Sequence, residues 1–322
     1  MKKTIGICTL IYAGSALQAE TLPVEGIFAG EANIDARVQT IAFEGFGGDA
    51  GPELSFLLSD ILSAVEINGQ PWFAIVPAAT LAELHSGVNE DAEGKAIDTG
   101  PTAVLQGSAR TEFWEESAGV KKVISCGKKE RGDCVEKRKE VYDCHLLSVG
   151  YRPMLRLVAS DGTLLYESNK YLKTYQKYCE DEAAAPNPDD LLNSLAAQYA
   201  YSVRVDLAPQ FRSDKFRISE NRKGMSGDDA RSFKKAIQLT KSDQLAACVA
   251  FNELEAANPA HVSVLLNIGL CHESQGDLQL ARDYYNRTLD LNSGKDEAQA
   301  GLDRVVSRLI ARQQVSEHFS SY

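Results

Sequence analysis

Apolar and polar residues alternate along several short segments of the first half of the chain. Segments with the two-residue period of a strand lie at 37–43, at 72–77 and at 103–109, the last continuing toward Trp114. A glycine-rich loop at 45–51 leads into a helix that begins near Pro52 and stops at Asn68-Gly69. Its apolar face consists of Leu54, Leu57, Leu58, Ile61, Leu62 and Val65. A short helix at 79–84 and a loop at 86–100 are expected after the second strand.

The pattern then changes to hairpins and one long helix. Asp161-Gly162, a dipeptide typical of two-residue hairpin loops, joins strands at 151–158 and 164–171. An amphipathic helix over 191–203 is capped by Asp189 or Asp190.

These elements predict the first part of the domain organisation. We expect an α/β (α+β) domain over 34–209, with a mixed sheet and long hairpins. An irregular segment at 20–33 precedes it, and a polar linker at 210–227 follows it.

The last third of the chain has helical spacing and a repeat of 34 residues, in which Ala247 and Phe251 recur as Ala281 and Tyr285. Small residues at such positions allow antiparallel helices to approach closely. We therefore predict an all-helical region over 228–312, consisting of two helix pairs and a polar capping helix at about 296–312.

The later copy resembles a tetratricopeptide (TPR) repeat. The residues that carry the resemblance are Asn267-Ile268-Gly269, His272, Gly276-Asp277, Ala281, Tyr285 and Leu289. The earlier copy keeps Ala247, Phe251 and Pro259 but has Lys235 where the repeat has glycine. The resemblance implies a scaffold that binds other proteins. Its first-helix face, with Leu266, Leu270 and Glu273, is expected to contact a partner helix or the α/β domain.

The α/β domain resembles the periplasmic domain of the curli secretion channel family (CsgG-like) and, more loosely, the N-terminal domain of TolB. The matching segments are 43–49 with the leucine-rich helix, 73–81 and 104–108. The channel proteins are lipid-anchored and insert long apolar hairpins, and neither feature is expected here. The resemblance implies a role in envelope assembly.

Residues 1–19 have the form of a secretory signal peptide. Lys2 and Lys3 precede a short apolar run, and the sequence Ala16-Leu17-Gln18-Ala19 predicts cleavage after Ala19. We therefore expect a periplasmic or secreted protein without a transmembrane span. The net charge is −11 and becomes −13 when the two lysines are removed, which argues against nucleic acid as a partner.

The mature chain has an even number of cysteines, and disulfides are the expected state in an oxidising compartment. If Asp161-Gly162 is the turn, facing residues have numbers that add up to 323, and Cys144 and Cys179 meet this condition at an expected hydrogen-bonded pair. Cys248 and Cys271 are equidistant from the turn at Pro259-Ala260, and Cys126 and Cys134 pair by elimination. A zinc site and redox sensing are the alternatives to structural disulfides.

A basic segment interrupts this acidic chain. It contains Lys121, Lys122, Lys128, Lys129, Arg131, Lys137, Arg138 and Lys139. One interpretation is a hairpin that binds an anion: lipid headgroups, an acidic polymer or the acidic face of a partner. The other is an edge hairpin whose lysines prevent aggregation.

Motifs of enzymes are lacking in the sequence. There is no Gly-x-Ser-x-Gly, no His-Glu-x-x-His and no Cys-x-x-Cys, and no Lys-Ser/Thr follows the glycine-rich loop. His272 occupies an aromatic position of the repeat, which indicates packing. We predict a non-enzymatic scaffold or assembly factor of the cell envelope that binds a protein partner and needs no cofactor or metal. The alternatives are a secreted or periplasmic hydrolase and a self-assembling homo-oligomer.

Overall fold

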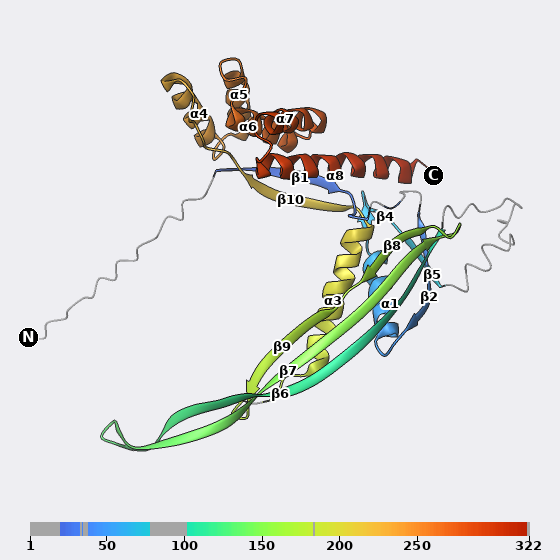
Figure 1. Ribbon diagram of the computed structural model, residues 1–322, viewed down its shortest axis with the longest axis vertical. Helices are drawn as coiled ribbons and strands as arrows, with labels where there is room; N and C mark the ends of the chain where they lie inside the picture. Colours follow the sequence, from blue (N-terminus) through green and yellow to red (C-terminus); the bar gives the residue numbers. More distant parts are fainter. Residues whose placement is uncertain (1–19, 33, 35–37, 78–101, 183, 321–322) are drawn as a thin grey trace, which may run out of the picture. The chain divides into compact units, whose positions relative to one another are not determined.

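The computed structural model describes residues 20–32, 34, 38–77, 102–182 and 184–320 (Figure 1). The chain divides into two compact units. One, the sheet unit, consists of residues 29–210 and 311–322, and the other, the helical unit, of residues 1–28 and 211–310. The expected signal peptide, the helix at 79–84 and the loop at 86–100 lie outside the described residues.

The sheet unit has a mixed sheet, as the sequence predicts, and its helices lie on one face of this sheet. Its strand order is β5-β2-β6-β7-β8, and β9 also pairs with β7. The central β2 (Thr40–Gly47) is parallel to β5 (Ala74–Pro77) and β6 (Thr102–Glu130). β7 (Asp133–Ala159) is antiparallel to β6, β8 (Leu164–Asn169) and β9 (Leu172–Cys179).

Helices α1 (Gly51–Ser63) and α3 (Pro188–Leu207) pack on each other and on the sheet. Leu54, Leu58 and Leu62 of α1 are fully buried, as the helical spacing predicts. Asn187 caps α3 by accepting a hydrogen bond from the backbone N–H of Asp189, so the predicted cap at Asp189 or Asp190 is wrong by two or three positions. After α1, Asn68-Gly69 forms the turn between two short strands, β3 (Glu66–Ile67) and β4 (Gln70–Pro71), and both turn residues have positive φ.

The hairpin around Asp161-Gly162 forms, but its loop has three residues instead of two. The Ala159 N–H donates to the Thr163 carbonyl, the Gly162 N–H donates to the Ala159 carbonyl, and Gly162 has a φ of 87°. A bulge between Leu157 and Val158 compensates for the extra loop residue. Facing residues beyond the bulge therefore have numbers that add up to 323, as the sequence predicts.

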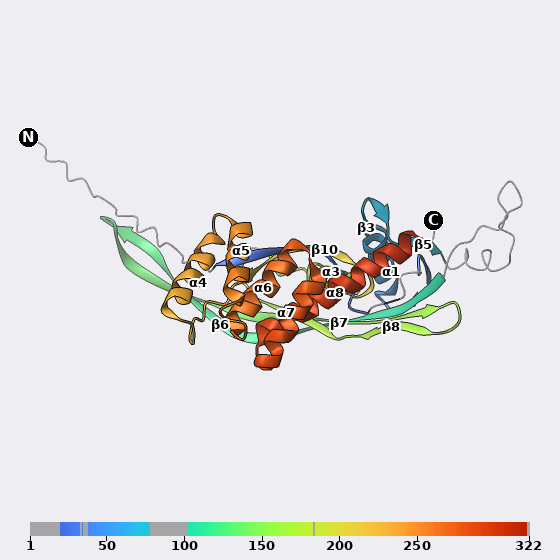
Figure 2. The ribbon, with the colours of Figure 1, turned by 90° about the horizontal axis from the view of Figure 1, so that it is seen from above.

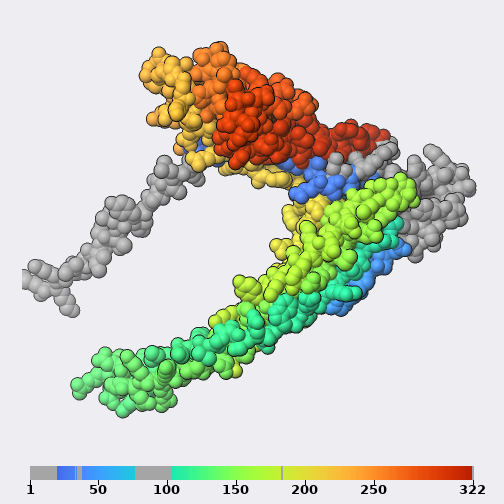
Figure 3. Space-filling model, in the orientation of Figure 1, coloured from blue at the N-terminus to red at the C-terminus, as the bar shows by residue number. Residues whose placement is uncertain are grey.

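Strands β6 and β7 are much longer than their neighbours. The expected end of the third strand near Trp114 is wrong, since β6 continues to Glu130. β9 pairs with β7 only from Tyr151 to Cys144, and beyond that point β6 and β7 pair only with each other. We call this two-stranded extension, residues 119–143, the arm. It projects from the end of the sheet (Figures 1 and 3).

The helical unit contains five consecutive helices (Figure 2). They are α4 (Gly227–Leu239), α5 (Gln244–Glu255), α6 (Val262–Gln275), α7 (Leu278–Leu291) and α8 (Asp296–Phe319), the last of which continues into the sheet unit from residue 311. As expected for helix pairs, α4 packs on α5, α5 on α6 and α6 on α7, and Tyr285 of α7 shares a buried cluster with Val305 of α8. Of the described helices, none is both long enough and apolar enough to cross a membrane.

Small residues allow the helices to approach. A Cβ atom on Gly269 would lie 3.0 Å from the Tyr285 ring, and one on Gly301 would lie 2.4 Å from it. Tyr285 and Ala281 are both buried. The small and aromatic positions of the sequence repeat are therefore packing positions.

Two segments expected to be irregular are strands. The segment at 20–33 contains β1 (Thr21–Phe28), and the expected linker at 210–227 contains all of β10 (Gln210–Arg217). The two strands pair with each other. Leu22, Val24 and Phe28 of β1 are buried among the helices. Pro23 and Gly26 obscure this strand pattern in the sequence.

Candidate functional site

The face expected to bind a partner is buried inside the helical unit. Leu270 packs in one cluster with Leu22, Val24 and Phe28 of β1, and Leu266 packs in another with Leu278 and Val305. Leu266 is 5% exposed and Leu270 is 4% exposed. The expectation that these residues contact a partner or the α/β domain is therefore corrected, because β1 and α8 of the same unit cover them.

Glu273, the third residue of that face, is fully buried in an ionic network. Arg304 donates to its two carboxylate oxygens at 2.8 and 2.7 Å, and the Tyr285 hydroxyl donates at 2.6 Å. Burial and the adjacent Glu273 carboxylate raise the pKa of Tyr285 well above its ordinary value. Burial opposes the charge of Arg304, but the hydrogen bonds and the charge of Glu273, together with Tyr285, outweigh this effect and raise the pKa of Arg304. Glu273 is therefore a structural residue of the unit.

The residues expected to bind an anion lie on the arm and are exposed. They are Lys128, Lys129, Arg131, Lys137, Arg138 and Lys139. Lys128 pairs with Glu130 at 2.7 Å and Arg138 with Glu136 at 3.2 Å. Residues 119–143, the arm, contain eight basic and five acidic side chains, a net charge of +3 in a chain of net charge −11. The arm is thus the basic part of an acidic protein.

One face of the arm also carries exposed apolar side chains, which the sequence analysis did not identify. Val120, Ile124 and Val141 are 52%, 69% and 53% exposed. In the strand register Lys122 is opposite Val141 and Ile124 is opposite Lys139, so these side chains share a face. In the sequence, the two-residue spacing of Val120, Lys122 and Ile124 indicates that they lie on one face of a strand. Side chains alternate between the two faces of β7. The arm face with these residues is therefore on the same side of β7 as the face that α3 covers in the sheet.

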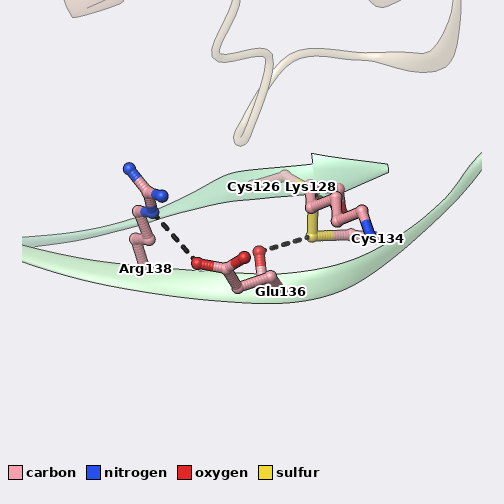
Figure 4. Close-up of a disulfide and its surroundings, with 5 residues drawn as sticks. All are labelled: Cys126, Lys128, Cys134, Glu136 and Arg138. Carbon is pink, nitrogen blue, oxygen red and sulfur yellow. Dashed lines mark hydrogen bonds and ion pairs between the residues drawn. A yellow bond between two sulfur atoms is a disulfide. The ribbon is translucent and has the colours of Figure 1, made fainter. Parts of the chain in front are cut away.

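A disulfide fixes the tip of the arm (Figure 4). Cys126 and Cys134 are joined as expected, with their Cα atoms 5.8 Å apart. The chain reverses at Arg131 and Gly132, which both have positive φ, as in a tight two-residue hairpin turn. An isolated two-stranded ribbon is only marginally stable in water, and the disulfide offsets this weakness.

A second disulfide lies at the base of the arm. Cys144 and Cys179 are joined as expected and form the last pair between β7 and β9. The neighbouring Glu180 N–H donates to the Asp143 carbonyl, so the cysteines occupy a non-hydrogen-bonded pair, with Cα atoms 4.0 Å apart. The expected pairing of the two cysteines is therefore correct, but the expectation that they occupy a hydrogen-bonded pair is wrong. Lys121 also pairs with Asp181 at 2.7 Å at this base.

The third expected disulfide, Cys248–Cys271, joins α5 to α6. All three pairings predicted from the sequence are therefore present. Disulfides fit a protein that works outside the reducing cytoplasm.

The glycine-rich loop after β2 has a structural role. A Cβ atom on Gly48 would lie 2.0 Å from the Ala109 carbonyl oxygen, so this position requires glycine. Asp49 accepts hydrogen bonds from the backbone N–H and the hydroxyl of Thr111. The hydroxyl bond is the main cause of a lowered pKa of Asp49. The loop thus fastens the start of α1 to β6.

In the described part of the chain, His272 lies 3.6 Å from Asp277, and this pair is not part of a larger cluster of ligand-type side chains. No group of three or more His, Cys, Asp and Glu residues there is arranged to hold a metal ion. His272 stacks on Tyr284, with ring centroids 5.5 Å apart, and His145 stacks on Tyr178 at 5.4 Å. These two histidines are packing residues.

Comparison with known proteins finds no protein-family model that matches the chain and no similar curated sequence.

Proposed function

We propose that this is an exported, non-enzymatic protein of the cell envelope that acts as a scaffold or assembly accessory factor and contacts its protein partner through the arm. The observation that carries the proposal is the arm face with Val120, Ile124 and Val141 exposed beside lysines. Contiguous exposed apolar residues rimmed by polar ones are typical of interaction sites.

The arm has the physical properties of a binding element. Disulfides at its base and tip limit its conformations before binding, which reduces the entropy lost on association. Its net positive charge favours an acidic partner surface and accelerates the encounter. Its backbone edges beyond Cys144 are unpaired in the described structure and suit addition of a strand from the partner.

The two resemblances fit this proposal. Consecutive packed helices with small residues at Gly269 and Ala281 support TPR-like repeats. A mixed sheet with two helices on one face supports a domain like that of the curli secretion channel family. Because β1 covers Leu270 of the repeat face, the arm replaces that face as the proposed contact.

The test is recovery of the partner from native envelopes with a full-length tagged chain. Ile124→Asp combined with Val141→Asp places charge on the arm face, and we expect partner recovery to fall about tenfold or more. Phe56→Asp is the matched control, since Phe56 lies on α1 and is 69% exposed, as is Ile124. Equal recovery with the arm variant and the unaltered chain would reject the arm as the contact surface.

A further inference from the structure

A cavity of about 500 Å³ lies on the sheet unit, in a size range typical of small-molecule sites. Ser108, Arg110, Arg152 and Met154 line it from β6 and β7. In β7 these positions alternate with Tyr151 and Leu155, which are buried on the side of α1 and α3. The cavity therefore lies on the opposite face of the sheet.

The lining of this cavity is basic. Its charged residues are Arg110, Arg152 and Lys170, and none of the described residues that line it is acidic. Arg110 and Arg152 are directly opposite each other on β6 and β7. Two like charges at facing positions destabilise a sheet unless an opposite charge lies between them.

One of the two guanidinium groups is already held in place. Arg152 donates to Glu112 at 2.8 Å and lies 4.0 Å from the centre of the Tyr171 ring. A Cβ atom on Gly150 would lie 3.1 Å from Tyr171 and 3.3 Å from Glu112, so the glycine makes room for this arrangement. Arg152 is thus oriented in advance, which favours recognition of a ligand.

The other two cations are available to a ligand. Arg110 and Lys170 are exposed, and neither has a carboxylate within ion-pair distance among the described residues. Asn169 adds an amide beside them. Met154 and Tyr171 provide apolar surface for the remainder of a ligand and are 48% and 47% exposed.

We propose that this cavity binds the phosphate group of a small organic phosphate ester. Arg110, Arg152 and Lys170 contact the phosphate oxygens, because guanidinium groups match oxyanions in charge and geometry. Met154 and Tyr171 contact the organic part. The phosphate belongs either to a soluble ester or to a lipid headgroup. This site is separate from the arm, and its failure would leave the proposed function of the arm unaffected.

The experiment measures binding of glycerol phosphate and of inorganic phosphate to the mature full-length protein by calorimetry at low salt. We expect saturable binding of glycerol phosphate that is tighter than binding of inorganic phosphate. Arg110→Gln and Lys170→Gln remove exposed charges without disturbing the core, and each is expected to weaken binding about tenfold. The control is Arg156→Gln, since Arg156 pairs with Glu167 on the same face and does not line this cavity.

A second measurement distinguishes the two sources of phosphate. Sedimentation with vesicles containing phosphatidylglycerol, compared with vesicles of phosphatidylcholine alone, tests for a lipid headgroup. Loss of vesicle binding with Arg110→Gln but not with Arg156→Gln supports the headgroup, and binding of glycerol phosphate without vesicle binding supports a soluble ester. Absence of saturable binding to every probe, or equal weakening by Arg156→Gln, overturns the proposal.

Discussion

At the scale of the residue, Glu273 is a charged side chain in the core of the helical unit. Its carboxylate is fully buried and is balanced by Arg304, whose side chain is 14% exposed. Arg304 also lies 3.6 Å from the centre of the Phe216 ring, so the pair connects α6, α8 and the end of β10. The stability of the unit therefore depends on both partners remaining charged and paired.

Glu273→Gln is expected to lower the free energy of unfolding of the helical unit by about 3 kcal/mol, because it leaves the guanidinium of Arg304 buried without its counter-charge. Urea unfolding followed by circular dichroism measures this change. Asp303→Asn, an exposed position on α8, is the control and is expected to change the stability little. A loss no larger than that of the control would mean that the network contributes little.

Burial raises the pKa of Tyr199 to about 12. The unfolded chain releases this proton near pH 10, before the folded chain does. The contribution of Tyr199 to the free energy of unfolding is therefore fully present below pH 10. It falls by up to about 3 kcal/mol as the pH rises toward 12. Urea midpoints at pH 8 and pH 11 should differ less in Tyr199→Phe than in Tyr201→Phe, whose ring is 55% exposed. Identical differences in the two variants would contradict this assignment.

Local residue patterns predict the cysteine pairs correctly but do not predict the burial of the expected binding face. The pairing of Cys144 with Cys179 follows from local turn geometry, which the bulge at Leu157 preserves. The burial of Leu266 and Leu270 depends on β1 and α8, which are distant in sequence. A local pattern shows that a face is apolar, but it does not show which part of the chain covers it.

At the scale of the element, the arm is the feature that the sequence only partly predicted. A basic hairpin was expected, but its continuity with β6 and β7 was not. Strand prediction depends on alternation between a buried and an exposed face. Along 120–142 both faces are largely in contact with solvent, so this signal is weak there.

Replacing Cys126 and Cys134 with serine should loosen the arm without unfolding the sheet unit. Closing a loop of this size contributes roughly 2–3 kcal/mol, and here the gain is confined to the arm. We expect faster hydrogen exchange at the amides of 120–142, while β2 and the sheet portion of β6 stay protected. Unchanged exchange in the arm would contradict a stabilising role for this disulfide.

Replacing Cys248 and Cys271 with serine has a different expected outcome. This disulfide closes a longer loop between two packed helices and should contribute about 3–4 kcal/mol to the whole helical unit. The urea midpoint of that unit should therefore fall, and exchange should increase across α5 and α6 together. A local change limited to the helix ends would show that the unit does not unfold cooperatively.

At the scale of the whole molecule, each unit combines distant parts of the chain. β1 belongs with residues 211–310, and residues from 311 onward belong with the sheet. His318 stacks on Trp72 at 3.9 Å, and its carbonyl accepts a hydrogen bond from Gln39. The predicted consecutive segments, 34–209 and 228–312, contain most of each unit but lack these additions, because local periodicity contains no information on such distant pairings.

Leu22→Asp combined with Val24→Asp tests whether β1 is part of the helical unit. Both side chains are fully buried there, so the variant places two charges in an apolar cluster. We expect a loss of roughly 4 kcal/mol or more in that unit, with proteolysis of the helices and retention of the sheet. Glu25→Gln, an exposed change on the same strand, is the control. A stable helical unit in the double variant would remove β1 from its core.

Site-specific photo-crosslinking in native envelopes shows whether the arm contacts a protein partner. A photoreactive amino acid replaces Ile124 in one full-length variant and Phe56 in another, both positions being 69% exposed. We expect a discrete cross-linked protein at position 124 that is absent at position 56. No product at position 124, or the same products at both positions, would contradict this expectation.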